Sequence, residues 1–272
     1  MTSATVPLDV LRHRNNVTEL GRADARPVLF VHGFGSGQEM WRLVVPAFLR
    51  EHRVVLFDHV GSGNSDLGAY DRRKYDSLYG YADDLLQIVE ALDLTDVVCV
   101  GHSVSAIIAM LAVTQDPSRF GALVLIGPSP RYTDTDGYRG GFDQDGINSL
   151  LDSIDANYLG WSRAMAPVLL AQAEESELTR ELTDAFSRAD PDITRHFARA
   201  TFLSDHRREL AKVAVPTLVV QCKDDVIAPE HVGEYVHAAI PGSAMVTLGA
   251  TGHWPVLSAP TQLAAEIQAF LW

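Results

Sequence analysis

The chain has 272 residues, of which 47% are hydrophobic and 21% charged, and its formal net charge is −13. These proportions are typical of a soluble globular protein, and the length suits one α/β domain with an insertion. Nucleic acid and anionic membrane surfaces are excluded as partners, because both would repel so acidic a chain. The longest apolar run, residues 106–113, is too short for a membrane span, and the N-terminus lacks the layout of a signal peptide. We therefore expect a cytoplasmic protein.

Short apolar runs typical of buried strands recur along the chain, at residues 28–31, 54–57, 97–100, 123–126, 218–220 and 244–248. The runs are continuous rather than alternating, which indicates strands covered on both faces by helices in a mostly parallel sheet. A helix is predicted between the second and third runs. Its apolar residues share one face, namely Tyr81, Leu85, Ile88 and Leu92. Its acidic residues Asp83, Asp84 and Glu90 lie off that face.

The alternation of strands and helices stops after Ile126. No run typical of a strand follows until Val215, and the spacing predicts four helices, over residues 147–157, 161–171, 177–188 and 193–203. An all-helical insertion cannot join the sheet, so we expect it to cover the carboxyl ends of the strands, where such folds bind ligands. The expected division is a core of residues 1–127 and 206–272 and a helical cap of residues 128–205.

Ser103 lies at the junction of a predicted strand, residues 97–100, and a predicted helix that begins near Ala106. A strand that turns sharply into a helix needs small residues two before and two after the nucleophile, and Gly101 and Ser105 are small. Ser105 replaces the second glycine of the usual G-x-S-x-G pattern. The alternative is a serine that only caps the helix.

Two further residues follow predicted strands and can complete a Ser, Asp, His arrangement. Asp225 follows the run that ends near Cys222, and His253 follows the run that ends at Leu248. A histidine held in one tautomer by a carboxylate is the usual base for a serine nucleophile. Adjacent Asp224 is an alternative to Asp225, and a structural histidine is the alternative for His253. The loop after the first run would supply the Phe34 N–H, and the start of the helix the Val104 N–H, to hold an oxyanion.

Other motifs carry weaker expectations. Gly61-Ser62-Gly63 follows a strand, but Asp66 stands where a dinucleotide-binding loop needs its third glycine and would repel a pyrophosphate. His231 and His237 are six residues apart and would not face one another as metal ligands on a helix. The two cysteines, Cys99 and Cys222, lie in apolar runs and are expected to be buried free thiols.

The chain resembles the α/β-hydrolase superfamily and, within it, the RsbQ-type bacterial stress-regulator hydrolases and the related plant karrikin and strigolactone receptors. The motifs that carry the resemblance lie at residues 32–35, 56–63, 101–104, 127–130, 140–142, 157–158, 204–205 and 221–225. The resemblance implies an α/β-hydrolase fold with a mostly parallel, eight-stranded sheet and a four-helix cap inserted after the sixth strand. It also implies that one strand separates the strands of Cys99 and Cys222.

The resemblance also implies roles for individual residues. Ser103 would be the nucleophile, Asp225 the orienting acid and His253 the base, with Phe34 and Val104 at the oxyanion positions. Substrate-binding positions of the cap would be Phe142, Trp161, Met165, Phe186 and Phe202. Aromatic residues at helical spacing can equally belong to the core. Met165 stands where the plant receptors commonly carry phenylalanine, so the ligand of those receptors does not transfer.

The function expected from these residues is that of a serine hydrolase acting through an acyl-enzyme on a small apolar ester or lactone-like substrate, with no metal and no cofactor. The alternative is a ligand sensor with slow or no turnover, which would activate a protein partner such as a stress-response phosphatase through the cap. The residues do not separate the two. Haloalkane dehalogenase chemistry is excluded, because it needs a carboxylate at position 103.

Overall fold

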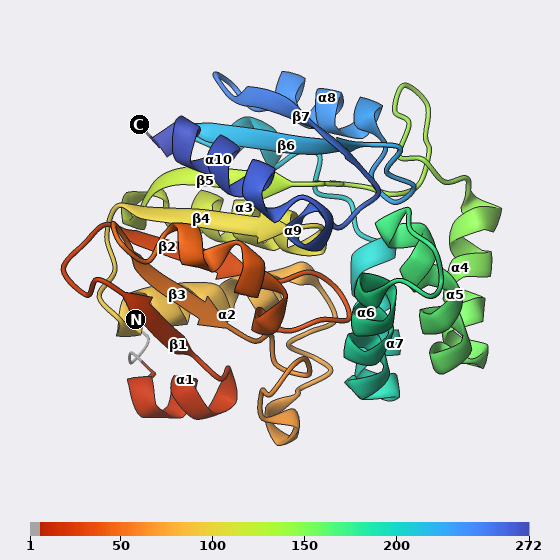
Figure 1. Cartoon of the computed structure of the whole chain (residues 1–272), viewed down its shortest axis with the longest axis horizontal. Helices are drawn as coiled ribbons and strands as arrows, with labels where there is room; N and C mark the ends of the chain where they lie inside the picture. The colour runs from red at the N-terminus through yellow and green to blue at the C-terminus, as the bar shows by residue number, and fades with distance from the viewer. Residues whose placement is uncertain (1–5, 272) are drawn as a thin grey trace.

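The computed structural model describes residues 6–271, and its centre is a seven-stranded sheet in the order β1-β3-β2-β4-β5-β6-β7 (Figure 1). β1 runs antiparallel to β3, and every other neighbouring pair is parallel. The strands are β1 (Thr18–Gly21), β2 (Pro27–Val31), β3 (Arg53–Phe57), β4 (Val97–His102), β5 (Phe120–Ile126), β6 (Thr217–Lys223) and β7 (Ala244–Thr251).

The central strands are buried on both faces, as their continuous apolar runs predict. Every residue of β4 is buried, and β2, β3, β5 and β6 each have a single residue that is not. The two edge strands differ. β1 carries no apolar run and was not predicted, while most residues of β7 keep partial or full exposure because one edge of that strand has no partner.

Two expectations about the sheet are wrong. Within residues 6–271 the sheet has seven strands rather than eight, and the helical insertion follows the fifth strand, β5, rather than the sixth. The expected order around the cysteines is confirmed, because β5 separates β4 from β6. Cys99 and Cys222 are both buried free thiols, and burial raises the pKa of Cys222 to about 12.

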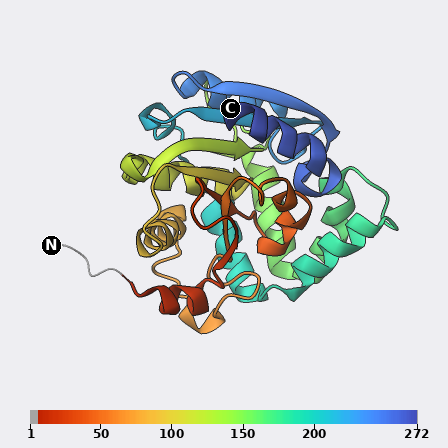
Figure 2. The ribbon, with the colours of Figure 1, turned by 60° about the vertical axis from the view of Figure 1, so that its left-hand side comes forward.

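Helices cover both faces of the sheet (Figures 1 and 2). In Figure 1, α2, α3 and α8 lie behind it, and α9 and α10 lie in front. The helices outside the insertion are α1 (Leu8–Arg14), α2 (Leu78–Ala91), α3 (Val104–Gln115), α8 (Glu230–Ala239), α9 (Pro255–Ser258) and α10 (Pro260–Leu271). Five 3-10 turns complete the core: η1 (Gln38–Leu43), η2 (Val45–Ala47), η3 (Leu67–Ala69), η4 (Pro117–Arg119) and η5 (Leu210–Lys212). None of the helices between residues 6 and 271 has the length and apolar character that a membrane span requires.

The predicted apolar face of α2 is buried, but one acidic residue was placed wrongly. Asp84 was expected off the apolar face and is only 1% exposed. Its carboxylate accepts a hydrogen bond of 2.7 Å from Tyr75 and forms an ion pair of 3.0 Å with Arg14 and a second one with Lys74. The carboxylate can be buried here because these three partners satisfy it.

Four helices form the insert, α4 (Gln144–Ala156), α5 (Tyr158–Leu170), α6 (Glu177–Arg188) and α7 (Pro191–Phe202). All four begin after a side chain that accepts a hydrogen bond from the first turn, respectively Asp143, Asn157, Ser176 and Asp190. Such N-caps satisfy N–H groups that have no partner inside the helix. The insert lies beyond the carboxyl ends of the parallel strands, towards which their arrowheads point in Figure 1.

Candidate active site

Ser103 occupies a strained turn between β4 and α3. Its φ and ψ are 60° and −126°, a backbone conformation that residues other than glycine rarely adopt. The turn is so tight that a Cβ at Gly101 would lie 2.2 Å from the carbonyl oxygen of Ser105. The Ser103 N–H is held by a bond of 2.8 Å to the carbonyl of Ile126 in β5. Strain of this kind at a side chain that faces a cavity is typical of a nucleophile elbow.

The structure brings Ser103, His253 and Asp225 into one buried chain of hydrogen bonds. His253 Nε2 lies 2.7 Å from Ser103 Oγ, and His253 Nδ1 lies 2.7 Å from Asp225 Oδ2. The carboxylate can only accept, so the proton on the ring belongs on Nδ1 and Nε2 is left to accept from the serine hydroxyl. The three side chains therefore have the arrangement in which a histidine can remove the proton of a serine.

Asp225 rather than Asp224 takes part in this chain. Asp225 is 5% exposed, and its second oxygen accepts hydrogen bonds of 2.9 Å from the N–H groups of Ile227 and Ala228. Burial alone would raise the pKa of Asp225. The electrostatic attraction of His253 and the hydrogen bonds from His253 and the two N–H groups lower it by more, so the pKa lies below its ordinary value. Asp224 is exposed. The carboxylate beside His253 is thus held in its charged form.

The loop after β2 lies directly against the elbow. Gly33 is so close to the elbow that a side chain there would not fit: its Cβ would lie 2.8 Å from Nδ1 of His102 and 3.4 Å from Cβ of Ser103. The N–H groups of Phe34 and Val104 have no hydrogen-bond acceptor within residues 6–271. Phe34 also lines the cavity beside Ser103. Two free N–H groups close to a serine hydroxyl are the requirement for holding an oxyanion.

His102 was not predicted as part of the site. Its Nε2 donates a hydrogen bond of 2.8 Å to the backbone carbonyl of His253, whose N–H donates one of 2.7 Å to the carbonyl of Leu169 in α5. Burial lowers the pKa of His102 to about 3, so the ring stays neutral. The only available signal was its place next to Ser103, and that place does not disclose a contact with residue 253.

The hydroxyl of Ser103 opens on a narrow apolar cavity of about 30 Å³. The core and the insert both contribute to its wall, which is formed by Phe34, Ser103, Tyr132, Trp161, Leu169, Phe186, Thr201, Phe202, Ile227, His253 and Trp254. The aromatic rings pack edge to face across it. The ring centroids of Phe34 and Phe202 are 6.1 Å apart, and those of Phe186 and Trp254 are 6.0 Å apart.

Three of the five aromatic or methionine positions predicted to bind substrate line this cavity, namely Trp161, Phe186 and Phe202. Phe142 does not, because its backbone pairs with Thr133 in a β-bridge and its N–H bonds to the carbonyl of Tyr132, outside the insert helices. Met165 does not either. It is a partly buried side chain packed on the core, and the neighbouring turns of α5 reach the cavity through Trp161 and Leu169 instead.

Two polar groups in the cavity wall were missed. Tyr132 follows β5 and lines the cavity together with Ser103, and burial is the main reason why its pKa is raised. The hydroxyl of Thr201 is buried without a partner within the described residues, as is the indole N–H of Trp161. Buried polar atoms without a partner call for a ligand or a water molecule. Nothing in the local sequence marks Thr201, because its role depends on where α7 meets the cavity.

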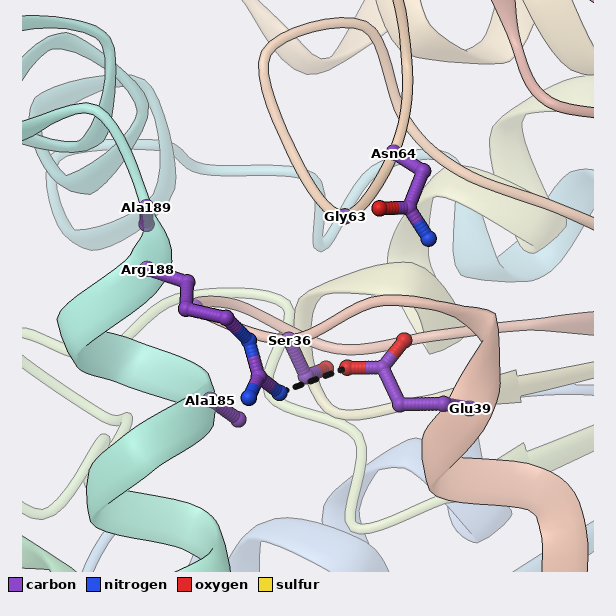
Figure 3. Close-up of a pocket in the computed structure, with 8 residues that line it drawn as sticks. Ser36, Glu39, Gly63, Asn64, Ala185, Arg188 and Ala189 are labelled. Atoms are coloured by element: carbon purple, nitrogen blue, oxygen red, sulfur yellow. Dashed lines mark ion pairs between the residues drawn. The ribbon is translucent and has the colours of Figure 1, made fainter.

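A second hollow, of about 220 Å³, lies where α6 meets the core (Figure 3). It is lined by Gly35, Ser36, Glu39, Gly63, Asn64, Ala185, Arg188 and Ala189. Figure 3 shows the ion pair of 3.9 Å between Arg188 and Glu39 across it. Both side chains are largely exposed, so this pair contributes little stability. None of the reactive side chains lines this hollow.

The other motifs are explained by structural contacts. The loop of Gly61 and Gly63 wraps around the carboxylate of Asp58, which accepts hydrogen bonds of 2.7 Å from the Gln38 N–H and 2.8 Å from the Asn64 N–H. The chain's own carboxylate therefore occupies the N–H groups of this loop region. His237 pairs with Ser243 at 2.8 Å. Within the described part of the chain, no group of three or more acidic, histidine or cysteine side chains could hold a metal ion.

Comparison with known proteins identifies the family of the chain. Residues 26–260 match the family described as alpha/beta hydrolase fold. The chain is 40% identical to strigolactone esterase D14 of Arabidopsis thaliana, over 94% of this chain and 96% of that protein. It is 35% identical to the karrikin insensitive 2 receptor IA of Petunia hybrida, with 86% of each chain covered.

Among solved structures, a hydrolase from Oleispira antarctica is similar to the chain, with 37% identity and a TM-score of 0.94 over 98% of this chain and 97% of that one. The family match covers most of the sequence, and relatives well above 30% identity cover nearly all of it. This chain belongs to the alpha/beta hydrolase fold family.

Proposed function

We propose that this protein is a serine hydrolase that cleaves a small, largely apolar ester or lactone through an acyl-enzyme at Ser103. The observation that carries the proposal is the buried chain from Ser103 through His253 to Asp225, with both contacts at 2.7 Å, on the wall of an apolar cavity. A serine hydroxyl is a weak nucleophile unless such a base removes its proton.

In the first step, His253 Nε2 takes the proton of Ser103 as Oγ attacks the carbonyl carbon of the substrate. The N–H groups of Phe34 and Val104 hold the oxygen that becomes negative, and Asp225 stabilises the imidazolium ion. Protonated His253 then gives its proton to the leaving alkoxide, so that an acyl ester on Ser103 remains. Water attacks this ester in the second step with the same base, which releases the acid and restores the serine.

Esters and lactones suit this site better than charged substrates. The cavity wall is mostly aromatic and aliphatic, and apart from His253 the polar groups on it are hydroxyl and indole groups that carry no charge at neutral pH. The insert acts as a cap in this proposal, since it supplies Trp161, Leu169, Phe186, Thr201 and Phe202 to the wall. The cavity is narrow, about 30 Å³, so a bulky substrate requires these side chains to move apart.

The test uses p-nitrophenyl acetate and a fluorophosphonate probe with the wild-type protein and Ser103→Ala. We expect product release from the wild type, and one probe adduct per chain by intact mass, with both lost in the variant. Absence of a Ser103-dependent adduct would refute the proposal. Asp224→Asn is the matched control, since Asp224 is exposed and outside the chain of hydrogen bonds.

A second candidate is a ligand sensor in which a slowly hydrolysed or merely bound lactone changes the insert and recruits a protein partner, such as a stress-response phosphatase. Two observations favour it: the cavity beside Ser103 is narrow, and one relative is a receptor by name. A sensor would release one product per chain from a butenolide lactone, keep the adduct, and bind its partner only with the lactone present. Rapid multiple turnover without ligand-dependent capture of a partner would contradict it.

A further inference from the structure

We propose that Ser105, together with His59, is a positioning residue that fixes the β2 loop (residues 32–35) against the nucleophile elbow. The proposal rests on the function proposed above. Ser105 departs from the glycine usual in this turn, and tight packing does not explain the departure, because the close contact falls on Gly101 and on the backbone of Ser105. The Ser105 side chain is free to bond elsewhere. It is fully buried and contacts two polar groups.

The hydroxyl of Ser105 bridges two parts of the core that are distant in sequence. It donates a hydrogen bond of 2.5 Å to the carbonyl of His32, at the start of the β2 loop. It lies 2.7 Å from Nε2 of His59, which follows β3. A hydroxyl has one proton, and the carbonyl can only accept, so the histidine must donate. His59 therefore carries its ring proton on Nε2.

His32 has the opposite tautomer, which the same network determines. Its Nε2 accepts a bond of 3.0 Å from the backbone N–H of His59, so its proton lies on Nδ1 and is donated to the carbonyl of Gly33 at 2.9 Å. The hydroxyl of Ser36 donates to the same carbonyl at 3.0 Å. Burial lowers the pKa of His59 well below its ordinary value, so its ring remains neutral and the pattern persists across the working pH range.

This network sets the direction of the Phe34 N–H. In a trans peptide the C=O and the N–H point in opposite directions. The carbonyl of Gly33 is held by His32 and Ser36, so the N–H of Phe34, in the same peptide unit, must point the opposite way. The preceding peptide unit is fixed by Ser105, through the carbonyl of His32.

Ser105 also ties the two proposed oxyanion donors together. It is the residue after Val104, whose N–H is one donor, and it bonds directly to the loop that carries Phe34. The other close contact of the loop with the elbow is packing, that of Gly33 on His102 and Ser103. Small misplacements of such groups can reduce rates by about 10²-fold, because the bonds to the oxyanion form only in the transition state.

The experiment compares Ser105→Ala, Ser105→Gly, His59→Leu and His59→Gln with the wild type. We measure kcat and KM on p-nitrophenyl acetate, and inhibition by an aryl trifluoromethyl ketone, whose adduct carries an oxyanion. We expect three variants, Ser105→Ala, Ser105→Gly and His59→Leu, to lower kcat about 10-fold to 100-fold with little change in KM. The affinity for the ketone inhibitor should fall by a similar factor. In His59→Gln the amide N–H replaces the histidine Nε2–H, and kcat recovers towards the wild-type value.

The double variant Ser105→Ala with His59→Leu should be no slower than the slower single variant, because both break the same network. Thr217→Val is the matched control: it removes another buried hydroxyl that bonds a backbone carbonyl, at 2.9 Å from Val215, where β6 begins. It should keep kcat.

Ser105 variants with kcat and ketone affinity within twofold of the wild type would overturn the inference. The inference would also be overturned if the Ser105 variants and Thr217→Val lost the same amount of kcat at the same loss of Tm. If Ser105→Ala does not fold, the inference is tested by the other three variants, Ser105→Gly, His59→Leu and His59→Gln. A wild type that forms no Ser103 adduct would instead refute the proposed function, so the two failures are distinguishable.

Discussion

The elbow and the insert meet at one cavity, and the side chains that each presents to it are held by different contacts. At the elbow, Ser103, His253 and Asp225 are joined by hydrogen bonds of 2.7 Å. The insert reaches the same cavity through rings such as Trp161 and Phe186, whose centroids are 5.7 Å apart in a tilted arrangement. Hydrogen bonds fix direction and distance closely, while contacts between rings tolerate rotation and shift.

This difference assigns separate tasks to the two regions. In the proposed function, the core fixes the reacting atoms, and the insert decides which molecules reach them. Changes at the elbow should therefore affect kcat, and changes in the insert should affect the choice of substrate.

The largest effect is expected from Asp225→Asn. An amide can donate to His253 and favours the wrong tautomer, so we expect kcat to fall about 10³-fold to 10⁴-fold while KM changes little. Asp224→Asn alters the exposed neighbour and should retain activity. Steady-state kinetics on p-nitrophenyl acetate provides the measurement. Equal losses in the two variants would show that the site does not depend on this particular carboxylate.

Stability around the elbow should depend on pH through buried histidines. Burial lowers the pKa of His102 to about 3 and that of His59 well below its usual value, so at acidic pH the unfolded chain binds protons that the folded chain does not. Stability should thus fall as the pH decreases below about 6.5, by about 1.4 kcal/mol per pH unit for each such histidine.

His102→Gln should reduce this slope, since glutamine does not titrate and its amide can still donate to the carbonyl of His253. Urea unfolding at pH 7.5, 6.5, 5.5 and 4.5 measures the slope. The lowered pKa of Asp225 adds a further loss at lower pH, because its stabilising effect is present above about 3.9 and disappears as the carboxylate is protonated. A slope unchanged by His102→Gln would contradict the assignment.

A change in the insert should alter selectivity. Phe186→Ala removes a ring that is 1% exposed and lies between the cavity and the hollow of Figure 3, since a Cβ at Gly35 would be 2.4 Å from that ring. We expect kcat/KM for p-nitrophenyl butyrate relative to acetate to rise about 10-fold. Leu182→Ala, an equally buried change on α6 outside the cavity wall, serves as the control. If both variants change the ratio equally, the cavity wall does not select the substrate.

Strain at the nucleophile predicts a conflict between stability and activity. Ser103→Gly relieves the φ of 60°, whereas Ser103→Ala keeps it. Both variants lose activity, but the glycine variant should be more stable than the alanine variant by about 1 kcal/mol. Thermal unfolding compares them. A less stable glycine variant would mean that the conformation at residue 103 stores no strain.

The smallest effect is expected at the outer edge of the insert. Arg42 in η1 and Glu181 in α6 form an ion pair of 2.6 Å, but their side chains are 42% and 33% exposed. Glu181→Gln should change the free energy of unfolding by less than about 1 kcal/mol and leave kcat unchanged. Urea unfolding at low and high salt measures the change. A larger loss, or altered kcat, would mean that this contact helps to shape the cavity.

Much of the fold follows from local patterns in the sequence. Apolar runs predicted six of the seven strands, β2 to β7, and helical spacing predicted the four insert helices to within three residues at each end. Both signals are local, because the period of the apolar residues reflects which sides of an element are covered. The place of Ser103 at the end of β4 is likewise evident from the strand, the small residues and the helix that follows.

Other features depend on which segments meet after folding. The helical spacing of α2 places Asp84 off the apolar face and predicts that it is exposed. Asp84 is buried because Arg14 and Tyr75, from two other segments, pair with its carboxylate. Phe142 and Met165 match the residue types of a ligand pocket but lie outside the cavity wall, while Tyr132 and Thr201 belong to it.

His102 and Ser105 show the same limit near the nucleophile. Their partners, the carbonyls of His253 and His32, are 151 and 73 residues away along the chain. Local residue patterns indicate which residues could react and where the strands end. Which neighbours hold those residues depends on how the chain folds, because side-chain hydrogen bonds between distant segments leave no periodic pattern in the chain.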